Sequence, residues 1–536
     1  MSKTMRLIAA LVSGVMLSLP WLGFPGWILF VAWIPLLAID SYYLSLGDKV
    51  KSIHFWAYAF LAFLIWNSLT TWWIVHATAM GALLAILANS LLMSVVAWLA
   101  HLLRKNSTGS VGYIGWVAFW LTFEFFHFHW DIEWPWLTLG NGFANNIMLV
   151  QWYEFTGVLG GSLWVLVVNI LLFTSLGRVL SSQSFRPAII PLAVVVLFLS
   201  VPIFVSHLIY NQVGDDGETR TVLLVQPNID PYSETFDEGA VNDKLMKFIR
   251  LAESGLQDNV DYVIGPETVF EQDWDEEQLE TYPAIHQLRL LTEGKSNRAL
   301  IIGASTYRIY HNGENKTSTA RDSRDGSYSF DRYNTALFAS STGGIQTYHK
   351  SILVSGVEKM PFSRYLGFLN KFIINLGGTT GSLGIQDEPE NFKAPNGDLI
   401  APVICYESVF GGYLSKFVQQ GAGFITIITN DGWWKNTPGY RQHFAFSRLR
   451  AIETRRYIAR AANTGISGVI GLRGEILAST PWWTEAVEKS IVKLNDKLTF
   501  YVKYGDYLGR ISMFMSGLLV FYLISGTLRK GKKNPH

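Results

Sequence analysis

Apolar segments of roughly bilayer-spanning length are the feature of this sequence that most constrains its fold. Seven of them fill roughly the first 210 residues, and an eighth lies near the C-terminus. One such segment is often a buried helix of a globular protein, but about eight in one chain indicate a polytopic helical membrane protein. The expected spans are residues 5–22, 24–44, 53–75, 79–103, 110–128, 155–177, 187–210 and 505–528.

Lysine and arginine residues are distributed unevenly among the connections between these spans. They lie before or at the start of the first span, follow the second, fourth and sixth, and follow the last: Lys3, Arg6, Lys49, Lys51, Arg104, Lys105, Arg178, Arg186, Arg529, Lys530, Lys532 and Lys533. The other short connections contain neither residue. The positive-inside rule therefore predicts that both termini are cytoplasmic. Seven crossings then place residues 211–504 on the outer side.

The stretch from 211 to 504 has the pattern of a globular α/β domain. Apolar β-type runs alternate with helical stretches, and the runs include TVLLVQPN, DYVIGPE, ALIIGAS, LIAPVICYES and GFITIITN. Strands of this kind between helices predict sheets covered on both faces. We expect three parts: a helical bundle over 1–210, an α/β domain over 211–504, and a last helix with a basic tail over 505–536. The net charge of +1 gives no sign of a nucleic-acid partner.

The loop 127–150 is rich in tryptophan, with Trp130, Trp134 and Trp136 close together. Tryptophan commonly gathers at membrane–water interfaces, so an aromatic belt is one interpretation. The other is a re-entrant or membrane-surface segment that shapes a lipid entry, with Trp136 as a substrate contact.

Three runs of the α/β domain end near a residue that can carry chemistry. Glu267 follows DYVIGP, Lys350 follows QTYH, and Cys405 follows LIAPVI. Ligands gather at the carboxyl ends of strands in such domains, so these side chains can meet although they are far apart in sequence. Cys405 is the only cysteine of the chain. It is therefore either a buried packing residue or a nucleophile, and the residues around it have to decide.

A Cys–Glu–Lys set suits acyl transfer through a thioester. A thiol is a weak nucleophile until it loses its proton, and a nearby carboxylate can accept that proton. A lysine ammonium can then stabilise the oxyanion of a tetrahedral intermediate. The backbone N–H of Tyr406 is a natural second donor.

The motifs PETVF, YHK and ICYES resemble those of the nitrilase, or carbon–nitrogen hydrolase, superfamily. Such a domain after seven spans and before an eighth is similar to the bacterial apolipoprotein N-acyltransferases. Further similar pieces are WPWLTLGN, VQPNID, YNTALF, and TNDGWW followed by a helix ending RAANTG. The resemblance covers nearly the whole chain and implies an αββα sandwich outside a bundle of about eight transmembrane helices.

The resemblance also implies roles for individual residues. Glu267 is expected to be the general base, Lys350 the electrostatic stabiliser and Cys405 the nucleophile. Glu358, eight residues after the lysine, corresponds to an auxiliary glutamate, although this chain has VSGVEKMP where the family often has a VPFGE-type run. Two further supporting residues, Tyr406 and Glu407, follow the nucleophile as in the family.

Other polar and aromatic residues of the domain have more than one interpretation. TNDGWW follows a strand, which favours a simple turn, with Trp433 as a substrate-binding wall as the alternative. Charged residues lie along one helical stretch, where ion pairs on a solvated face are expected and head-group binding is the alternative: Arg448, Arg450, Glu453, Arg455 and Arg456. His443 and the aromatic-flanked His127 and His129 lack the neighbours in sequence that a metal site needs, so we expect no metal and no cofactor.

The reaction that the resemblance implies has two steps. A membrane phospholipid donates an acyl chain to Cys405, and the α-amino group of the diacylglyceryl-cysteine of a lipoprotein then accepts it. The expected setting is the bacterial cytoplasmic (inner) membrane, with the catalytic domain on the periplasmic side and the protein acting as a monomer. Two other classes stay open: a membrane-tethered amidase or nitrilase, and a non-enzymatic membrane protein such as a transporter.

Overall fold

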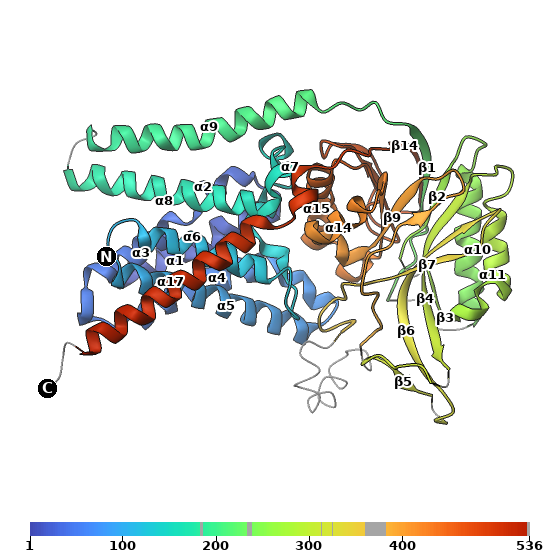
Figure 1. Cartoon of the computed structure of the whole chain (residues 1–536), viewed down its shortest axis with the longest axis horizontal. Helices are drawn as coiled ribbons and strands as arrows, with labels where there is room; N and C mark the ends of the chain where they lie inside the picture. Colours follow the sequence, from blue (N-terminus) through green and yellow to red (C-terminus); the bar gives the residue numbers. More distant parts are fainter. Residues whose placement is uncertain are drawn as a thin grey trace. The chain divides into compact units, whose positions relative to one another are not determined.

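The computed structural model describes residues 1–182, 186–232, 238–267, 269–311, 313–323, 325–359 and 382–532. The chain divides into two compact units (Figure 1). One comprises residues 1–75, 79–212 and 504–536, and the other comprises residues 76–78 and 213–503.

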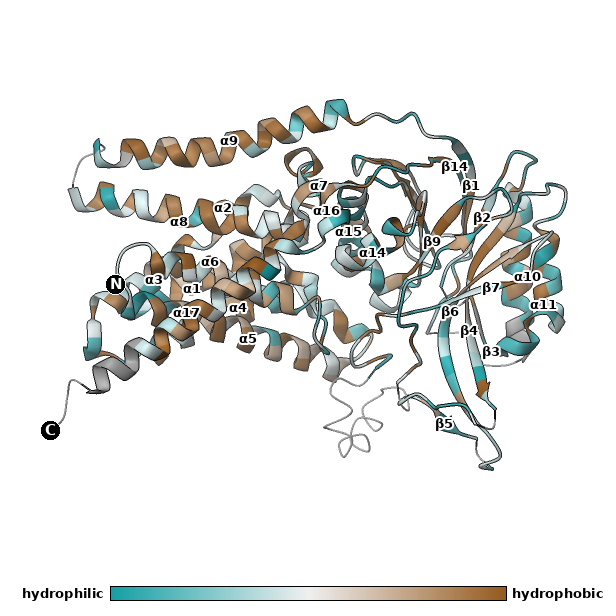
Figure 2. Ribbon diagram, in the orientation of Figure 1, coloured by the Kyte–Doolittle hydropathy of each residue, from teal (hydrophilic) through white to brown (hydrophobic). Residues whose placement is uncertain are grey.

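Long apolar helices make up the first unit. Its main helices are α1 (Lys3–Ser18), α3 (Ile34–Ser45), α4 (Ile53–Thr71), α5 (Ala79–Asn106), α6 (Val111–Phe126), α8 (Val158–Ser182), α9 (Ile189–Gln212) and α17 (Tyr507–Lys532). Figure 2 shows hydrophobic residues along most of their length. Among the described residues, seven helical segments are long and apolar enough to cross a membrane. Helices of this length and composition are typical of membrane spans.

The helix at the fifth expected span, residues 110–128, is shorter than predicted. It forms α6, an apolar helix of 16 residues that is shorter than the other seven segments. At about 1.5 Å per residue, such a helix is about 24 Å long, against a hydrocarbon core of about 30 Å. The chain then leaves the helix at His127, where the tryptophan-rich loop begins.

Tryptophan packing holds the centre of this unit together. Trp33, Trp66, Trp116 and Trp120 are each at most 1% exposed. The ring of Trp33 meets Trp120 edge-on at 4.5 Å and Trp116 at 5.7 Å, the arrangement that aromatic quadrupoles favour.

Part of the loop 127–150 packs into the same unit. The segment 135–149 forms three short 3₁₀ turns, η5 (Pro135–Leu137), η6 (Leu139–Phe143) and η7 (Ile147–Leu149). Trp136 is 1% exposed, and its ring stacks on Trp134 at 5.7 Å and packs against Trp73 at 5.0 Å. The indole predicted to contact substrate is therefore a core side chain in this structure, and its substrate role remains a prediction.

Two β-sheets form the centre of the second unit. The first has the order β14-β1-β2-β4-β6-β5, with β3 paired to β4 and β7 paired to β6. Its strands are β1 (Thr219–Gln226), β2 (Tyr262–Ile264), β3 (Phe270–Asp275), β4 (Ala299–Tyr310), β5 (Arg321–Asp322), β6 (Ser329–Ser340), β7 (Gln346–His349) and β14 (Ala486–Lys493). The second has the order β13-β12-β11-β10-β9-β8. Its strands are β8 (Phe392–Lys393), β9 (Leu399–Ile404), β10 (Phe424–Thr429), β11 (Ile458–Ala462), β12 (Gly468–Ile470) and β13 (Ile476–Ser479).

Helices cover the outer faces of both sheets. Residues of α10 (Glu238–Gly255) and α11 (Pro283–Leu290) share one apolar core with the first sheet. A second core joins both sheets to α14 (Gly411–Gln419) and α15 (Pro438–Thr454). This is the αββα sandwich that the sequence predicts, so the fold class is confirmed.

The charged residues of α15 and the turn after it contradict their predicted place on a solvated face. Arg450, Glu453 and Arg456 are fully buried, and Arg455 is 5% exposed. Arg450 pairs with Glu453 at 2.9 Å and donates to the carbonyl of Val409 at 2.6 Å. The guanidinium groups bind backbone carbonyls of neighbouring segments, which satisfies a buried charge without solvent.

Candidate active site

The three predicted catalytic residues all lie at or just after strand ends. Glu267 lies three residues beyond β2, Lys350 directly follows β7, and Cys405 directly follows β9. Lys350 Nζ lies 3.1 Å from Glu267 Oε1 and 2.8 Å from Glu358 Oε1. Both predicted glutamates therefore meet the lysine, although the loop after it departs from the family pattern.

Charge balance in this cluster leaves a carboxylate able to act as a base. Burial opposes the charged form of Lys350, but Glu267 and Glu358 outweigh it and hold the pKa of Lys350 well above its usual range. The ammonium of Lys350 thus contacts two carboxyl groups, and a carboxyl group is a side chain that can serve as the base for a thiol. Burial raises the pKa of the Cys405 thiol, the charge of Glu267 raises it further, and Lys350 opposes this shift. The resting group is therefore a thiol that needs a base.

Asn334, in β6, is a site residue that the sequence did not single out. Its Nδ2 donates to Glu267 Oε1 at 2.7 Å and to Glu358 Oε1 at 3.1 Å. The backbone carbonyl of Asn334 accepts from the backbone N–H of Lys350 at 2.8 Å. Glu267 Oε2 also accepts from the backbone N–H of Asn430, at 3.0 Å. The signal in the sequence was an amide in the middle of the apolar strand YNTALF.

Cys405 lies on a strained turn. Its φ of +48° is in the left-handed region, which costs a non-glycine residue about 1–2 kcal/mol. The 3₁₀ turn η11 (Cys405–Val409) starts at this residue. Strain of this kind persists only where surrounding contacts hold it, and it is common at catalytic sites.

Glu407 connects the segment of Cys405 to the segment of Lys350. Its carboxylate is fully buried and accepts from the backbone N–H of Ile404 at 2.8 Å, one residue before Cys405. It also accepts from the backbone N–H of Ser351 at 2.7 Å, one residue after Lys350, and from Tyr348 Oη at 2.7 Å. Glu407 therefore fixes the separation of the segments that carry Cys405 and Lys350, and its supporting role in the site remains a prediction.

The two aromatic site predictions of this unit have different surroundings. Tyr406 is 5% exposed, and its ring meets Phe410 edge-on at 5.3 Å. Trp433 lies in η12 (Asp431–Trp434) and is 42% exposed, with its ring 5.5 Å from that of Tyr232. Trp433 follows Asn430, which contacts Glu267, so a role in the wall of the site remains a prediction.

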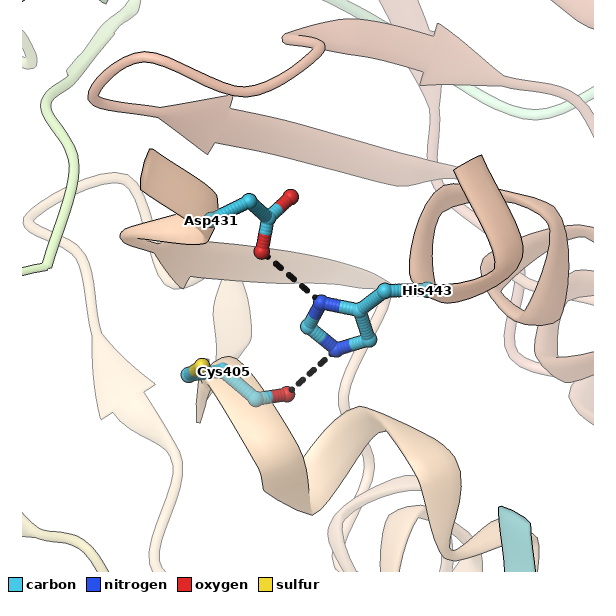
Figure 3. Close-up of side chains that lie close together, drawn as sticks. All are labelled: Cys405, Asp431 and His443. Atoms are coloured by element: carbon cyan, nitrogen blue, oxygen red, sulfur yellow. Dashed lines mark hydrogen bonds and ion pairs between the residues drawn. The ribbon is translucent and has the colours of Figure 1, made fainter. Parts of the chain in front are cut away.

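Cys405, Asp431 and His443 lie close together in the second sheet's layer (Figure 3). One ligand atom of each lies within 4.8 Å of the others. However, Arg460 Nη2 lies 2.7 Å from Asp431 Oδ2 and 3.0 Å from His443 Nδ1. A guanidinium already neutralises the carboxylate, and Figure 3 shows the sulfur pointing away from the imidazole. The donor set suits a hydrogen-bond network better than a metal ion.

Comparison with known proteins identifies both parts of the chain. Residues 221–496 match the sequence model of the carbon–nitrogen hydrolase family, which is more than half of the chain. The chain belongs to the carbon–nitrogen hydrolase family. Residues 13–171 match the apolipoprotein N-acyltransferase N-terminal domain. Within the family the chain therefore groups with the apolipoprotein N-acyltransferases, as its motifs and spans predict.

Several proteins named apolipoprotein N-acyltransferase are similar to this chain over most of their length. The apolipoprotein N-acyltransferase of Chlorobaculum tepidum is 28% identical over 524 residues, which cover 95% of each chain. That of Geobacter metallireducens is 28% identical over 519 residues, covering 93% of this chain and 91% of the relative. That of Rickettsia typhi is 30% identical over 363 residues, or 65% of each chain. The prediction that the chain is an acyltransferase is confirmed.

Proposed function

We propose that this protein transfers an acyl chain from a membrane phospholipid to the N-terminal diacylglyceryl-cysteine of lipoproteins, through a thioester on Cys405. The observation that carries the proposal is the buried contact of Lys350 with Glu267, at strand ends beside the strained turn of Cys405. The long apolar helices of the first unit support a substrate that resides in the membrane.

In the first step, the thiol of Cys405 attacks the ester carbonyl of the phospholipid while Glu267 accepts its proton. Lys350 Nζ and the backbone N–H of Tyr406 stabilise the oxyanion. The intermediate collapses with loss of the lysophospholipid alkoxide, which takes the proton back from Glu267. The acyl chain is then bound to sulfur as a thioester.

In the second step, the free α-amino group of the diacylglyceryl-cysteine attacks the thioester carbonyl. Glu267 accepts a proton from the amine, and the same two donors stabilise the oxyanion. The C–S bond breaks, and the thiolate of Cys405 takes the proton from Glu267. The product is an amide, and the enzyme returns to its starting state.

The proposed setting follows from the loop charges. Both termini lie in the cytoplasm, residues 211–504 lie on the periplasmic side of the bacterial inner membrane, and one chain is the active unit. Both substrates carry acyl chains, which favour apolar surroundings by about 0.8 kcal/mol per buried CH₂. They therefore reach the enzyme by lateral diffusion, at high local concentration.

An acyl-transfer assay with defined lipids tests the proposal. Purified protein in vesicles of phosphatidylethanolamine, which carries two labelled acyl chains, is mixed with a diacylglyceryl-cysteine peptide. We expect a triacylated peptide, and no product from the N-acetylated peptide or with the Cys405→Ala variant. Release of free fatty acid without peptide product would favour the amidase-like alternative, and no turnover of any ester would favour the non-enzymatic one.

A further inference from the structure

The carbonyl group of the nucleophile is held by side chains that the reaction scheme above does not use. His443 Nε2, on α15, lies 3.2 Å from the carbonyl oxygen of Cys405 (Figure 3). Ser408 Oγ donates to the same oxygen at 2.7 Å and lies 2.9 Å from His443 Nε2. His443 and Ser408 are both fully buried. The polar contacts therefore fix the direction of this carbonyl without help from solvent.

A charged pair holds the imidazole in turn. His443 Nδ1 lies 2.9 Å from Asp431 Oδ1 and 3.0 Å from Arg460 Nη2. Asp431 also accepts from Thr429 Oγ1 at 2.8 Å, and it pairs with Arg460 at 2.7 Å. Burial and the charge of Arg460 lower the pKa of His443, so the ring carries one proton. Asp431 Oδ1 at Nδ1 and the Cys405 carbonyl oxygen at Nε2 both accept, so the single ring proton serves one of them at a time. In the tautomer in which Arg460 donates to Nδ1, the proton is on Nε2 and is donated to the Cys405 carbonyl.

The geometry of the peptide bond links the contact between His443 and the Cys405 carbonyl to the oxyanion site. The carbonyl of Cys405 and the N–H of Tyr406 belong to one planar trans peptide unit, so they point in opposite directions. Figure 3 shows the carbonyl oxygen directed toward His443 and the sulfur of Cys405 directed away from it. Holding the carbonyl on the His443 side therefore directs the Tyr406 N–H to the opposite side of the peptide, away from His443.

We propose that His443 is a positioning residue that aligns the Tyr406 N–H with the reacting carbonyl by holding the Cys405 carbonyl on the opposite side of the same peptide. This inference rests on the proposed thioester mechanism. His443 touches neither substrate nor sulfur in this role. Its effect should therefore appear in oxyanion stabilisation and not in the intrinsic reactivity of the thiol.

Two reactions of Cys405 separate these effects. Acylation by an ester passes through an oxyanion, whereas alkylation by iodoacetamide is a displacement without one. Because Cys405 is the only cysteine, both can be followed by the mass of the intact protein. Acylation is measured with two esters, phosphatidylethanolamine and p-nitrophenyl butyrate. If wild-type protein is acylated by p-nitrophenyl butyrate and not by the phospholipid, the proposed substrate is wrong. The positioning role of His443 is then still tested with p-nitrophenyl butyrate.

The variants are His443→Leu, His443→Gln and Ser408→Ala. Arg448→Gln is the control on the same helix, because Arg448 contacts the carbonyl of Gly474 at 2.8 Å. Glutamine can place an amide N–H near the position of Nε2. We expect His443→Leu to slow acylation by about 10- to 100-fold with little change in KM, since loss of one oxyanion donor costs about 10²–10³. Ser408→Ala should lose less, because the imidazole donor remains.

The expected pattern across readouts defines the test. In His443→Leu the alkylation rate should stay within about threefold of wild type, whereas the acylation rate falls. His443→Gln should recover at least a third of the lost acylation rate on a logarithmic scale. If the leucine variant does not fold, His443→Gln and Ser408→Ala are compared with wild type, and each should acylate more slowly while its alkylation rate stays within about threefold. Equal losses in acylation and alkylation would overturn the positioning role, as would unchanged acylation in His443→Leu or the absence of any recovery in His443→Gln.

Discussion

Glu358 Oε1 lies 2.8 Å from Lys350 Nζ, a shorter distance than the 3.1 Å between the lysine and the proposed base, Glu267. The other oxygen of Glu358 accepts from the backbone N–H of Val354 at 2.7 Å. Glu358 therefore ties the lysine to the loop that follows it. Its contacts are those of a residue that orients the lysine, and it shares the donors Lys350 Nζ and Asn334 Nδ2 with the proposed base.

Substitution of Glu358 by alanine should cause an intermediate loss of activity. Without Glu358, Lys350 keeps its contact with Glu267 but loses the second contact that orients its ammonium group. We therefore expect the acylation rate to fall about tenfold, which is less than for loss of a general base. Glu358→Gln keeps the bond from Val354 and should lose less. Single-turnover acylation measures this. Wild-type rates in the alanine variant would show that Glu358 has no part in positioning the lysine.

Glu267→Gln and Lys350→Met should each lower the acylation rate by at least about 10²-fold, the scale of one general base or one oxyanion donor. They should differ in stability. Lys350→Met leaves the buried carboxylate of Glu267 and the partly buried carboxylate of Glu358 without their cation, and removing one partner of a buried ion pair costs about 3–5 kcal/mol. Adding Glu358→Gln to Lys350→Met should recover part of that stability and none of the rate. Chemical unfolding and single-turnover kinetics on the same samples check both statements, and a stable, active Lys350→Met enzyme would remove the lysine from the mechanism.

Alkylation of Cys405 should have an unusual pH dependence. Burial and the nearby carboxylates of Glu267 and Asp431 raise the pKa of the thiol, and Lys350 compensates only in part. A raised pKa keeps the group protonated to higher pH, so the iodoacetamide rate should still rise between pH 8 and pH 10. The denatured protein is the control and should level off above its ordinary thiol pKa of about 8.5. A plateau at or below pH 8.5 in the folded protein would show that the thiol is already activated at rest.

The orientation in the membrane depends on α6 acting as a crossing. If it does, a reporter that is active only in the cytoplasm should be silent when fused after about residue 300 and active when fused at the C-terminus. The short length of α6 makes this test informative, because one crossing fewer would reverse the prediction. Strong activity of the fusion near residue 300 would place the catalytic unit in the cytoplasm.

The sequence could name candidates for the site where they are visible along the chain. Glu267, Lys350 and Cys405 were candidates because each follows a recognisable strand, and strand ends are where α/β domains bind ligands. The structure places Lys350 in contact with Glu267, and the catalytic roles of the three stay predictions. Asn334 and His443 were missed because their roles depend on partners that are distant in sequence, 67 residues away for Asn334 and Glu267 and 38 for His443 and Cys405. A polar residue inside an apolar strand or helix does not reveal its partner.

For the charged residues of α15 the predicted ion pair is present, but the prediction that it lies on a solvated face is wrong. Arg450 and Glu453 have the spacing of an ion pair on an exposed helix, and the sequence alone favours that interpretation. In the structure the pair is fully buried, and Arg450 binds the carbonyl of Val409 at the end of η11, the turn that begins at Cys405. Helical periodicity shows which residues share a face, and it does not show what covers that face.

Intact mass spectrometry of the wild-type protein after incubation with phospholipid, without an acceptor, tests the central claim most directly. The account predicts a gain of one acyl chain on Cys405, release of one equivalent of lysophospholipid in a burst, and loss of the added mass with neutral hydroxylamine. A diacylglyceryl peptide with a free amine should discharge the adduct, and Cys405→Ser should form none. If no adduct forms with any phospholipid while Cys405→Ser lowers the stability of the fold, the thiol is a packing residue and the acyl-transfer account is wrong.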